Sequence, residues 1–206
     1  MAFINEIEEL ENVDNIENYI INKGKIPVVL TASHTMQQIK EDGSIKLSEP
    51  YTKAIALYVS KNINCNSLIK LKDTGIDSNS DNIDEFKLVL KDLIDDKNIK
   101  LLIDIHGASK DRDFDIELGT LNNMSVDYST INELKEAFIE NGINNIAIND
   151  PFKGGGITRY IYGMTDIDVI QIEINKKYRD IENVDNIEKV CNALISFIKQ
   201  YNDKIM

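Results

Sequence analysis

The only two histidines of this 206-residue chain occupy matching places in the sequence. Each follows an apolar run that is typical of a buried strand: His34 comes soon after residues 26–30, and His106 comes directly after residues 101–105. In open α/β sheets, ligands bind in the crevice outside the carboxyl ends of the strands. The two imidazoles are therefore predicted to lie at the ligand-binding edge of a sheet and to hold a metal ion there.

A catalytic zinc site needs a third protein ligand and keeps one further position open. The candidate carboxylates are Glu49, Asp104 and Asp111. Asp104 is expected to point away from His106 along the strand, so that the two would not share a metal. Glu49, at the start of a helix, is the preferred ligand, although an acidic residue there also interacts favourably with the helix dipole without any metal.

The last apolar run, residues 169–174, is interrupted by a charged residue, Glu173. Burying a charge is costly unless it is paired. One interpretation is that Glu173 faces outward on an edge strand. The other is that it accepts a proton as water attacks a substrate and returns that proton to the leaving amine. Its position inside the strand favours the catalytic interpretation.

Arginine is scarce, with three residues against twenty lysines, so its planar guanidinium is expected where bidentate pairing is needed. Arg112 lies in a polar loop after His106, and Arg159 lies just beyond a run of three glycines. Within that run, Gly155 and Gly156 would let the backbone approach a ligand closely. Both arginines are predicted to pair with a substrate carboxylate, and the alternative for each is a surface ion pair in an acidic protein.

Strands that alternate with helices predict a single α/β domain over residues 1–206. We expect three layers, a mostly parallel mixed sheet with helices on both faces. A hairpin signal at Asp42-Gly43 predicts a flap over residues 35–48, and residues 72–80 form a polar loop. Expected helices cover about 4–22 (or two short ones there), 50–62, 82–97, 130–141 and 185–203. Expected strands are 26–30, 67–71, 101–105, 114–118, 145–148 and 169–174.

The net charge of −12 argues against nucleic acid and anionic membranes as partners, because both would be repelled. A small anionic substrate is still compatible with a few cations focused in a cleft. The N-terminal residues are acidic, with no Lys or Arg before Lys23, which is unlike a targeting signal, and we expect a cytoplasmic protein. Cys65 and Cys191 fit no metal or disulfide pattern and are expected to be reduced. The sequence does not define the oligomeric state.

Several short motifs together resemble the N-formylglutamate amidohydrolase family. They are Ser33-His34, Asp104-Ile105-His106-Gly107, and the runs at residues 115–120, 152–156 and 171–175. The resemblance spans about residues 26–180. It implies a zinc-dependent hydrolase with a carboxypeptidase-like, phosphorylase/hydrolase-type fold.

The same resemblance implies roles for individual residues. His34 and His106 would be metal ligands, and Glu173 would be the acid/base. Arg112 and Arg159 would bind the substrate carboxylate or an oxyanion. Asn175 and Tyr178 would line the pocket.

The sequence departs from the carboxypeptidase pattern at Gln37, where a metal-binding Glu would follow the first His by three residues. The spacing from His34 to Glu49 is instead similar to that of zinc N-acetylmuramoyl-L-alanine amidases, which supports Glu49 as the third ligand. The chain is also expected to be short for the family and to lack part of the usual substrate enclosure.

The sequence thus predicts a zinc-dependent amidohydrolase that acts on a small N-acylated amino acid or peptide with a free carboxylate. One alternative is a non-catalytic domain that binds a small anion and keeps the hydrolase fold. Another is a cell-wall peptide amidase, against which the absence of a secretion signal and of a basic surface counts. The exact substrate, and whether residues 35–48 or 72–80 close over the site, are not determined by the sequence.

Overall fold

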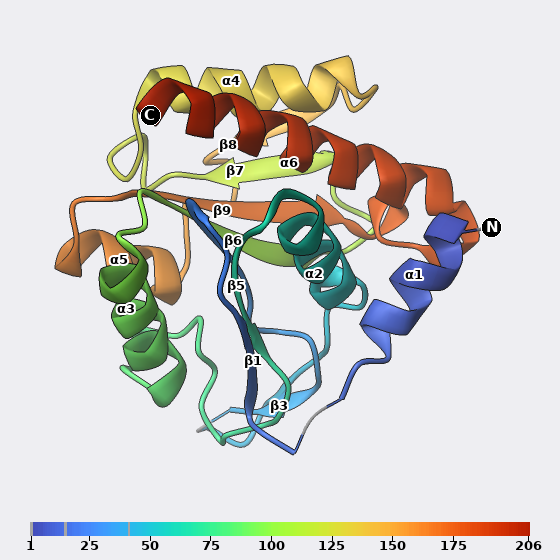
Figure 1. Ribbon diagram of the computed structural model, residues 1–206. Helices are drawn as coiled ribbons and strands as arrows, with labels where there is room; N and C mark the ends of the chain where they lie inside the picture. The colour runs from blue at the N-terminus through green and yellow to red at the C-terminus, as the bar shows by residue number, and fades with distance from the viewer. Residues whose placement is uncertain (1, 15, 41) are drawn as a thin grey trace.

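A central mixed sheet forms the middle of the molecule in the computed structural model, which describes residues 2–14, 16–40 and 42–206 (Figure 1). Within these residues the sheet has seven strands. Their order across the sheet is β1 (Tyr19–Asn22), β5 (Cys65–Lys70), β2 (Ile26–Ala32), β6 (Leu101–Ala108), β9 (Asp168–Asn175), β7 (Ile116–Gly119) and β8 (Ile146–Ile148).

Parallel pairing dominates the centre of this sheet. The neighbours β5, β2, β6 and β9 run parallel, whereas β1 pairs antiparallel with β5 and β7 pairs antiparallel with β9. Parallel neighbours need crossover connections, and these place helices on the faces of the sheet. The carboxyl ends of β2, β6 and β9 therefore meet at one edge, where His34, His106 and Glu173 lie.

Helices cover both faces of the sheet and enclose two apolar cores (Figure 1). The larger core lies against α1 (Ala2–Glu11), α2 (Thr52–Ile63), α4 (Tyr128–Glu140) and α6 (Val184–Ile205). The smaller core lies against α3 (Glu85–Lys97) and α5 (Gly156–Met164). This three-layer arrangement confirms the predicted α/β fold.

Two segments differ from the sequence-based expectation. The expected helix over residues 4–22 ends at Glu11, and its last four residues form β1 because they pair with β5 and Tyr19 packs edge-to-face on Phe86. Tertiary pairing here overrides the helical spacing. The helix α5 was not expected; it begins at Gly156, and its Ile157 and Ile161 bury one face in the smaller core.

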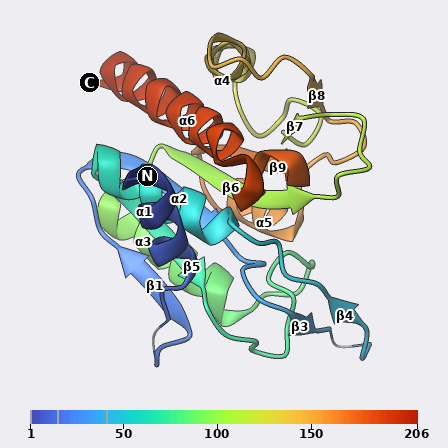
Figure 2. The same ribbon diagram turned by 90° about the vertical axis from the view of Figure 1, so that its right-hand side faces the viewer.

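The expected flap is present as a separate two-stranded hairpin, β3 (Gln38–Ile39) and β4 (Ile45–Lys46). It stands apart from the main sheet (Figure 2). At the base of the hairpin Gln38 is buried and pairs with Lys46, whereas Ile39 and Ile45 are exposed further out. Among the described residues, no helix combines the length and apolar character that a membrane span would require.

Candidate metal centre and active site

His34, Glu49 and His106 meet in a buried cluster at the carboxyl edge of the sheet. His34 lies two residues after β2, His106 lies within the last part of β6, and Glu49 precedes α2. Their facing atoms are close: the His34 and His106 Nδ1 atoms are 3.1 Å apart, and Glu49 oxygens lie 2.9 Å from His34 Nδ1 and 3.3 Å from His106 Nδ1. The predicted metal ligands are thus brought together.

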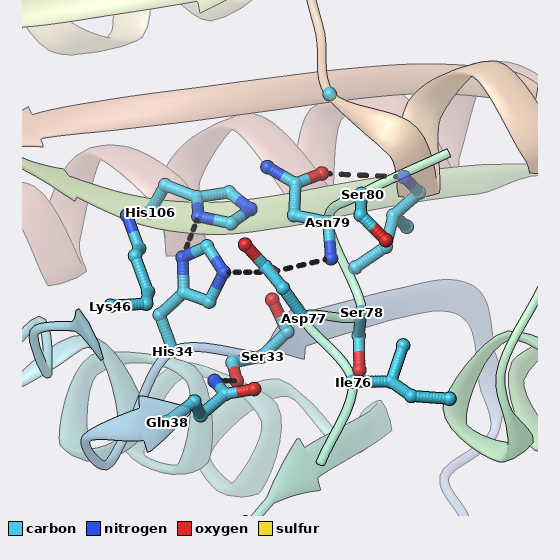
Figure 3. A network of polar contacts seen from close by, with 12 residues as sticks. Ser33, His34, Gln38, Lys46, Ile76, Asp77, Ser78, Asn79, Ser80 and His106 are labelled. Carbon is cyan, nitrogen blue, oxygen red and sulfur yellow. Dashed lines mark hydrogen bonds and ion pairs between the residues drawn. The ribbon is translucent and has the colours of Figure 1, made fainter. Parts of the chain in front are cut away.

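The other nitrogen of each imidazole faces a further carboxylate. His34 Nε2 lies 2.7 Å from Asp77 Oδ1, and His106 Nε2 lies 2.9 Å from Asp104 Oδ2 (the His34 contact is drawn in Figure 3). Such partners hold metal-binding histidines in one tautomer and orientation. The expectation that Asp104 points away from His106 is wrong, since residues two apart on a strand share a face.

These residues fit a zinc ion. A tetrahedral ion with bonds of about 2.0–2.1 Å sets its ligand atoms about 3.3 Å apart, close to the separations in the cluster. Two imidazole nitrogens and one carboxylate leave one position open for water or substrate. The chemistry of the donor set and its outer carboxylates therefore matches a catalytic metal site.

Several contacts hold Glu49 in place. Its backbone N–H donates to the His34 carbonyl at 2.8 Å, and the Gly107 N–H donates to its Oε2 at 2.8 Å. The next residue, Pro50, accepts a hydrogen bond from the buried Arg179. Burial alone would raise the pKa of Glu49, but the adjacent His106 and His34 outweigh it and hold that pKa well below its usual range. Glu49 is therefore ionised and ready to bind a cation.

Glu173 lies beside the cluster in a row that crosses three strands. It is the register partner of His106 on β6 and of Glu117 on β7. Register partners on neighbouring strands point to the same face and lie about 5 Å apart. Neither carboxylate is on an outer surface of the sheet, since both are buried. The structural alternative for Glu173, an outward-facing residue on an edge strand, is therefore excluded.

The surroundings of the two glutamates favour the protonated form. Burial raises the pKa of Glu173, and burial together with the Glu173 charge raises the pKa of Glu117 to about 7. The Gln171 amide donates to Glu173 Oε1 at 2.9 Å, and the Phe152 N–H donates to Glu117 Oε1 at 2.6 Å. The second oxygen of Glu117 is buried without a hydrogen-bond partner. Two buried carboxyl groups with raised pKa values thus adjoin the metal cluster.

The loop over residues 72–84 carries Asp77 to His34 and is held from below by Lys70. This buried lysine donates to Gln38 Oε1, the Ile76 carbonyl and the Ser78 hydroxyl at 2.8–3.1 Å. Figure 3 shows Asp77 lying between His34 and the rest of the loop. The loop lies where sequence reasoning placed a possible lid, and its contacts fix it against the site.

The glycine run contacts this loop and the strand beneath it. The Gly155 N–H donates to Gln171 Oε1 at 2.6 Å, and the Gly156 N–H donates to the Asn79 carbonyl at 2.9 Å. A Cβ at either glycine would collide with residue 79 or 80, at 1.9 Å or less. These glycines are required for close packing of the site walls, and contact with a substrate stays a prediction.

The arginines lie around the cluster without joining it. The Arg112 guanidinium stacks over the Phe152 ring at 4.9 Å from its centroid. Arg159 is half-exposed and pairs with Asp81 at 2.6 Å. Arg179 is buried and donates to three backbone carbonyls, those of Ile174, Pro50 and Ala108. Substrate binding by Arg112 and Arg159 therefore stays a prediction.

The two predicted pocket residues after β9 are engaged within the protein. Asn175 donates to the carbonyls of Arg112 and Phe114 at 3.2 Å and 2.9 Å and so holds the Arg112 loop. Tyr178 donates to Asp115 Oδ2 at 3.1 Å and is buried. Asp111, the remaining candidate ligand, is exposed.

Sequence reasoning missed Asp77, Glu117 and Lys46. Lys46, on β4, lies 2.8 Å from Glu49 Oε1 and reaches up beside both imidazoles (Figure 3). Burial alone would lower the pKa of Lys46, but Glu49, with Glu173 and Asp77, outweighs it and raises that pKa. The alternation of the strand at 114–118 could have indicated Glu117, whereas Asp77 and Lys46 reach the site through loop contacts that leave no periodic signal.

A polar cleft of about 410 Å³ opens beside Asp77, between the hairpin and the loop over residues 72–84. Its lining residues are Lys40, Asp42, Asp77, Asn79, Ser80 and Asn82. The cleft thus reaches an outer carboxylate of the metal cluster, and the two segments predicted as possible lids form its walls.

The α/β fold, with its mixed, mostly parallel sheet, is like the zinc carboxypeptidase/amidase-type fold, and it carries a buried His–Glu–His set. Residues 84–178 match the family model described as N-formylglutamate amidohydrolase. This match is to the family that the sequence motifs resemble, and it covers the segment from β6 through β9 with its flanking elements α3 and Tyr178. No significant relative was found among curated proteins.

Solved structures with low sequence identity share the fold. An N-formylglutamate amidohydrolase from Ralstonia eutropha JMP134 is 12% identical with a TM-score of 0.70, over 93% of this chain and 100% of that one. A bacteriophage poly-gamma-glutamate hydrolase is 13% identical, with a TM-score of 0.60 and 95% coverage of both chains. A metallo-carboxypeptidase from Burkholderia cenocepacia is 14% identical with a TM-score of 0.54, over 100% of this chain and 68% of that one.

The coverage of the Ralstonia structure tests whether this chain is short for the family. This chain spans all of that protein, so the expectation that it is short for the family does not hold against this member.

Proposed function

We propose that this protein is a zinc-dependent amidohydrolase that cleaves an amide bond in a small N-acylated amino acid or peptide with a free carboxylate. The observation that carries the proposal is the buried set of His34, Glu49 and His106 beside Glu173. The family match over residues 84–178 supports amide hydrolysis. The names of two similar structures, an N-formylglutamate amidohydrolase and a poly-gamma-glutamate hydrolase, support a substrate that contains an acylated glutamate.

The metal would be held by the two Nδ1 atoms and by Glu49. A bound zinc ion polarises carbonyl groups and lowers the pKa of water to about 7. The contribution of the protein is to keep both imidazoles in the tautomer that presents Nδ1. Asp77 and Asp104 do this through the opposite nitrogens.

Glu173 holds and moves the proton in this proposal. Gln171 fixes one of its oxygens, and burial raises its pKa above the ordinary value. A carboxylate with a raised pKa accepts a proton from water at one stage and returns it to the leaving amine at the next. The charge of the neighbouring Glu49 adds to burial in raising the Glu173 pKa.

The first test is to measure zinc in protein purified without a chelator. We expect about one zinc per chain and hydrolysis of N-formyl-L-glutamate or a related N-acyl amino acid. A chain that holds no stoichiometric metal even after zinc reconstitution would contradict the proposal, and ligand binding without turnover would favour the non-catalytic alternative.

The second test separates the metal from the proton transfer. Glu173→Gln should retain zinc and lose at least about 100-fold in kcat, which is typical when a general acid–base is removed. The matched control is Glu140→Gln, which changes an exposed residue on α4. Full activity in Glu173→Gln would remove the role given to Glu173 and leave the metal site standing.

A further inference from the structure

Lys46 provides the cation that stands at the metal cluster itself. Its ammonium group lies 2.8 Å from Glu49 Oε1, an oxygen that also contacts His34 Nδ1. The three arginines are engaged elsewhere: Arg112 with Phe152, Arg159 with Asp81, and Arg179 with three backbone carbonyls. Among the described residues, Lys46 is therefore the Lys or Arg side chain that forms an ion pair with Glu49.

The distance from the cluster matters for the chemistry of an N-acyl amino acid. In such a molecule one carbon separates the scissile amide nitrogen from the α-carboxylate. A cation that binds this carboxylate must therefore stand next to the groups that act on the amide. Lys46 stands there, whereas Arg159 lies out at the surface with Asp81.

Hairpin pairing fixes the position of Lys46 relative to the metal ligands. Lys46 pairs with Gln38 in the hairpin, and the Gln38 side chain donates to the Ser33 carbonyl at 2.8 Å, directly before His34. Gln38 also accepts from the buried Lys70. The base of the hairpin is thus anchored to the segment that carries His34, and Lys46 is positioned before any ligand arrives.

When Glu49 binds a divalent ion, its negative charge is shared with that ion and attracts Lys46 less. The ammonium group then needs another acceptor. Because Lys46 is partly exposed, an anion in the site can supply one.

We propose that Lys46 binds the α-carboxylate of the substrate and makes the enzyme selective for substrates with a free carboxylate next to the scissile amide. The inference rests on the proposed function and assigns its anion specificity to the hairpin. It predicts that Lys46 competes with the metal for Glu49 and cooperates with the metal in binding substrate.

The experiment compares two ligands on the zinc-loaded full chain, N-formyl-L-glutamate and its α-carboxamide, N-formyl-L-isoglutamine. Dissociation constants are measured by calorimetry with Glu173→Gln as the background, so that turnover does not consume the ligand. With Lys46 present, we expect the carboxylate to bind about 10- to 100-fold more tightly than the amide, the range for a charged hydrogen bond. Lys46→Met should reduce this preference to less than about twofold, and Lys46→Arg should keep part of it.

Two controls make the result specific. Lys100→Gln removes one positive charge at the opposite end of β6 and should leave the preference unchanged. Zinc affinity, measured by competition with a chelator, should be equal or higher in Lys46→Met, since a competing cation has been removed. Circular dichroism melting curves check that each variant is folded, and Lys46→Gln, which also removes the charge, serves if Lys46→Met is not folded.

The outcomes separate this inference from the proposed function. A carboxylate preference that survives in Lys46→Met would overturn the inference, as would its absence in the Lys46-containing protein or a loss of zinc affinity in Lys46→Met. Failure of the wild-type chain to hydrolyse either ligand, with the preference intact and lost in Lys46→Met, would overturn the proposed hydrolysis alone and support the role of Lys46.

Discussion

The candidate site has two halves that are built in different ways. One half stands on the sheet: His106, Glu173 and Glu117 form a row across β6, β9 and β7, with Asp104 two residues before His106. The other half arrives on connecting segments: Glu49 precedes α2, Lys46 is on the hairpin, and Asp77 is on the loop over residues 72–84. The sheet fixes the first half by strand register, whereas the second half depends on individual side-chain contacts.

The two halves are held in place by different interactions. Strand residues belong to a hydrogen-bonded ladder and to the apolar cores on both faces. The two connecting segments, residues 35–48 and 72–84, contribute none of the described residues of either core. Polar anchors take the place of apolar packing there, namely Gln38 on Ser33 and Lys70 under the loop.

Arg179 joins the two halves and gives the largest expected effect on stability. Its guanidinium donates to Ala108 and Ile174 on the sheet half and to Pro50 beside Glu49. Arg179→Met would leave three carbonyls without these donors and should lower the free energy of unfolding by about 3 kcal/mol or more. Urea unfolding of the metal-free chain measures this, and a loss below about 1 kcal/mol would show that the halves are held independently.

Substitutions of Asp104 and Asp77 allow a direct comparison of the two halves, because Asp104 on the sheet half contacts His106 and Asp77 on the loop contacts His34. Asp104→Asn and Asp77→Asn should each weaken zinc binding by about 10- to 100-fold. Only Asp104→Asn should also destabilise the metal-free fold, by about 1–2 kcal/mol, since Asp104 is fully buried and accepts from the Thr31 hydroxyl at 2.6 Å. Chelator competition and urea unfolding measure the two effects. Equal destabilisation by both variants would remove the distinction between the halves.

The pH dependence of stability that Glu117 causes is a test of the sheet half. Its pKa is raised to about 7 in the folded chain from an ordinary value of 4.5, so the folded state binds the proton more tightly than the unfolded state. This group therefore makes the fold less stable as pH rises from about 4.5 to 7, and the loss persists above pH 7. Glu117→Gln should be stabilising by about 1–2 kcal/mol at pH 8 and neutral near pH 4. Thermal unfolding across this range would contradict the assignment if the difference did not change with pH.

The smallest expected effect compares two glycines. Gly163 lies in α5 with open space where a Cβ would stand, so Gly163→Ala should stabilise by about 0.5–1 kcal/mol. At Gly107 a Cβ would meet the Arg179 guanidinium at 2.3 Å, and that group cannot move without breaking its three hydrogen bonds. Gly107→Ala should therefore destabilise. Melting temperatures of the two variants give opposite signs, and equal signs would contradict this account.

The same division explains what could be predicted from the sequence. Apolar runs located the strands and placed His106 and Glu173 at one edge, because strand position and side-chain alternation are periodic. The orientation of Asp104 was predicted wrongly because side chains two residues apart on a strand, such as Asp104 and His106, point to the same face and not to opposite faces. Glu49 was preferred from its place at a helix start, and the resemblance to amidases supported it, because no periodic signal distinguishes a metal ligand there from an acidic residue that stabilises the helix.

The features that the sequence did not predict depend on contacts between segments that are distant along the chain. Asp77 reaches His34 only because Lys70 holds its loop, and Lys46 reaches Glu49 only because Gln38 fixes the hairpin. The scarcity of arginine suggested that Arg112 and Arg159 bind the substrate, yet Arg159 pairs with Asp81, and the arginine that donates to the backbone beside the site is Arg179. Residue 19 onward became a strand because β5 offered it an antiparallel partner.

The absence of core residues from the two connecting segments has a consequence for how this protein could be changed. Loop-length changes cost little when they do not disturb a core, because the entropy of closing a loop grows slowly with its length. Residues 35–48 and 72–84 could thus be changed in length and sequence while the row on the sheet stays in place, provided that Asp77 keeps its contact with His34. Variants of these two segments could then bind different substrates, while the residues on the sheet keep the same catalytic chemistry.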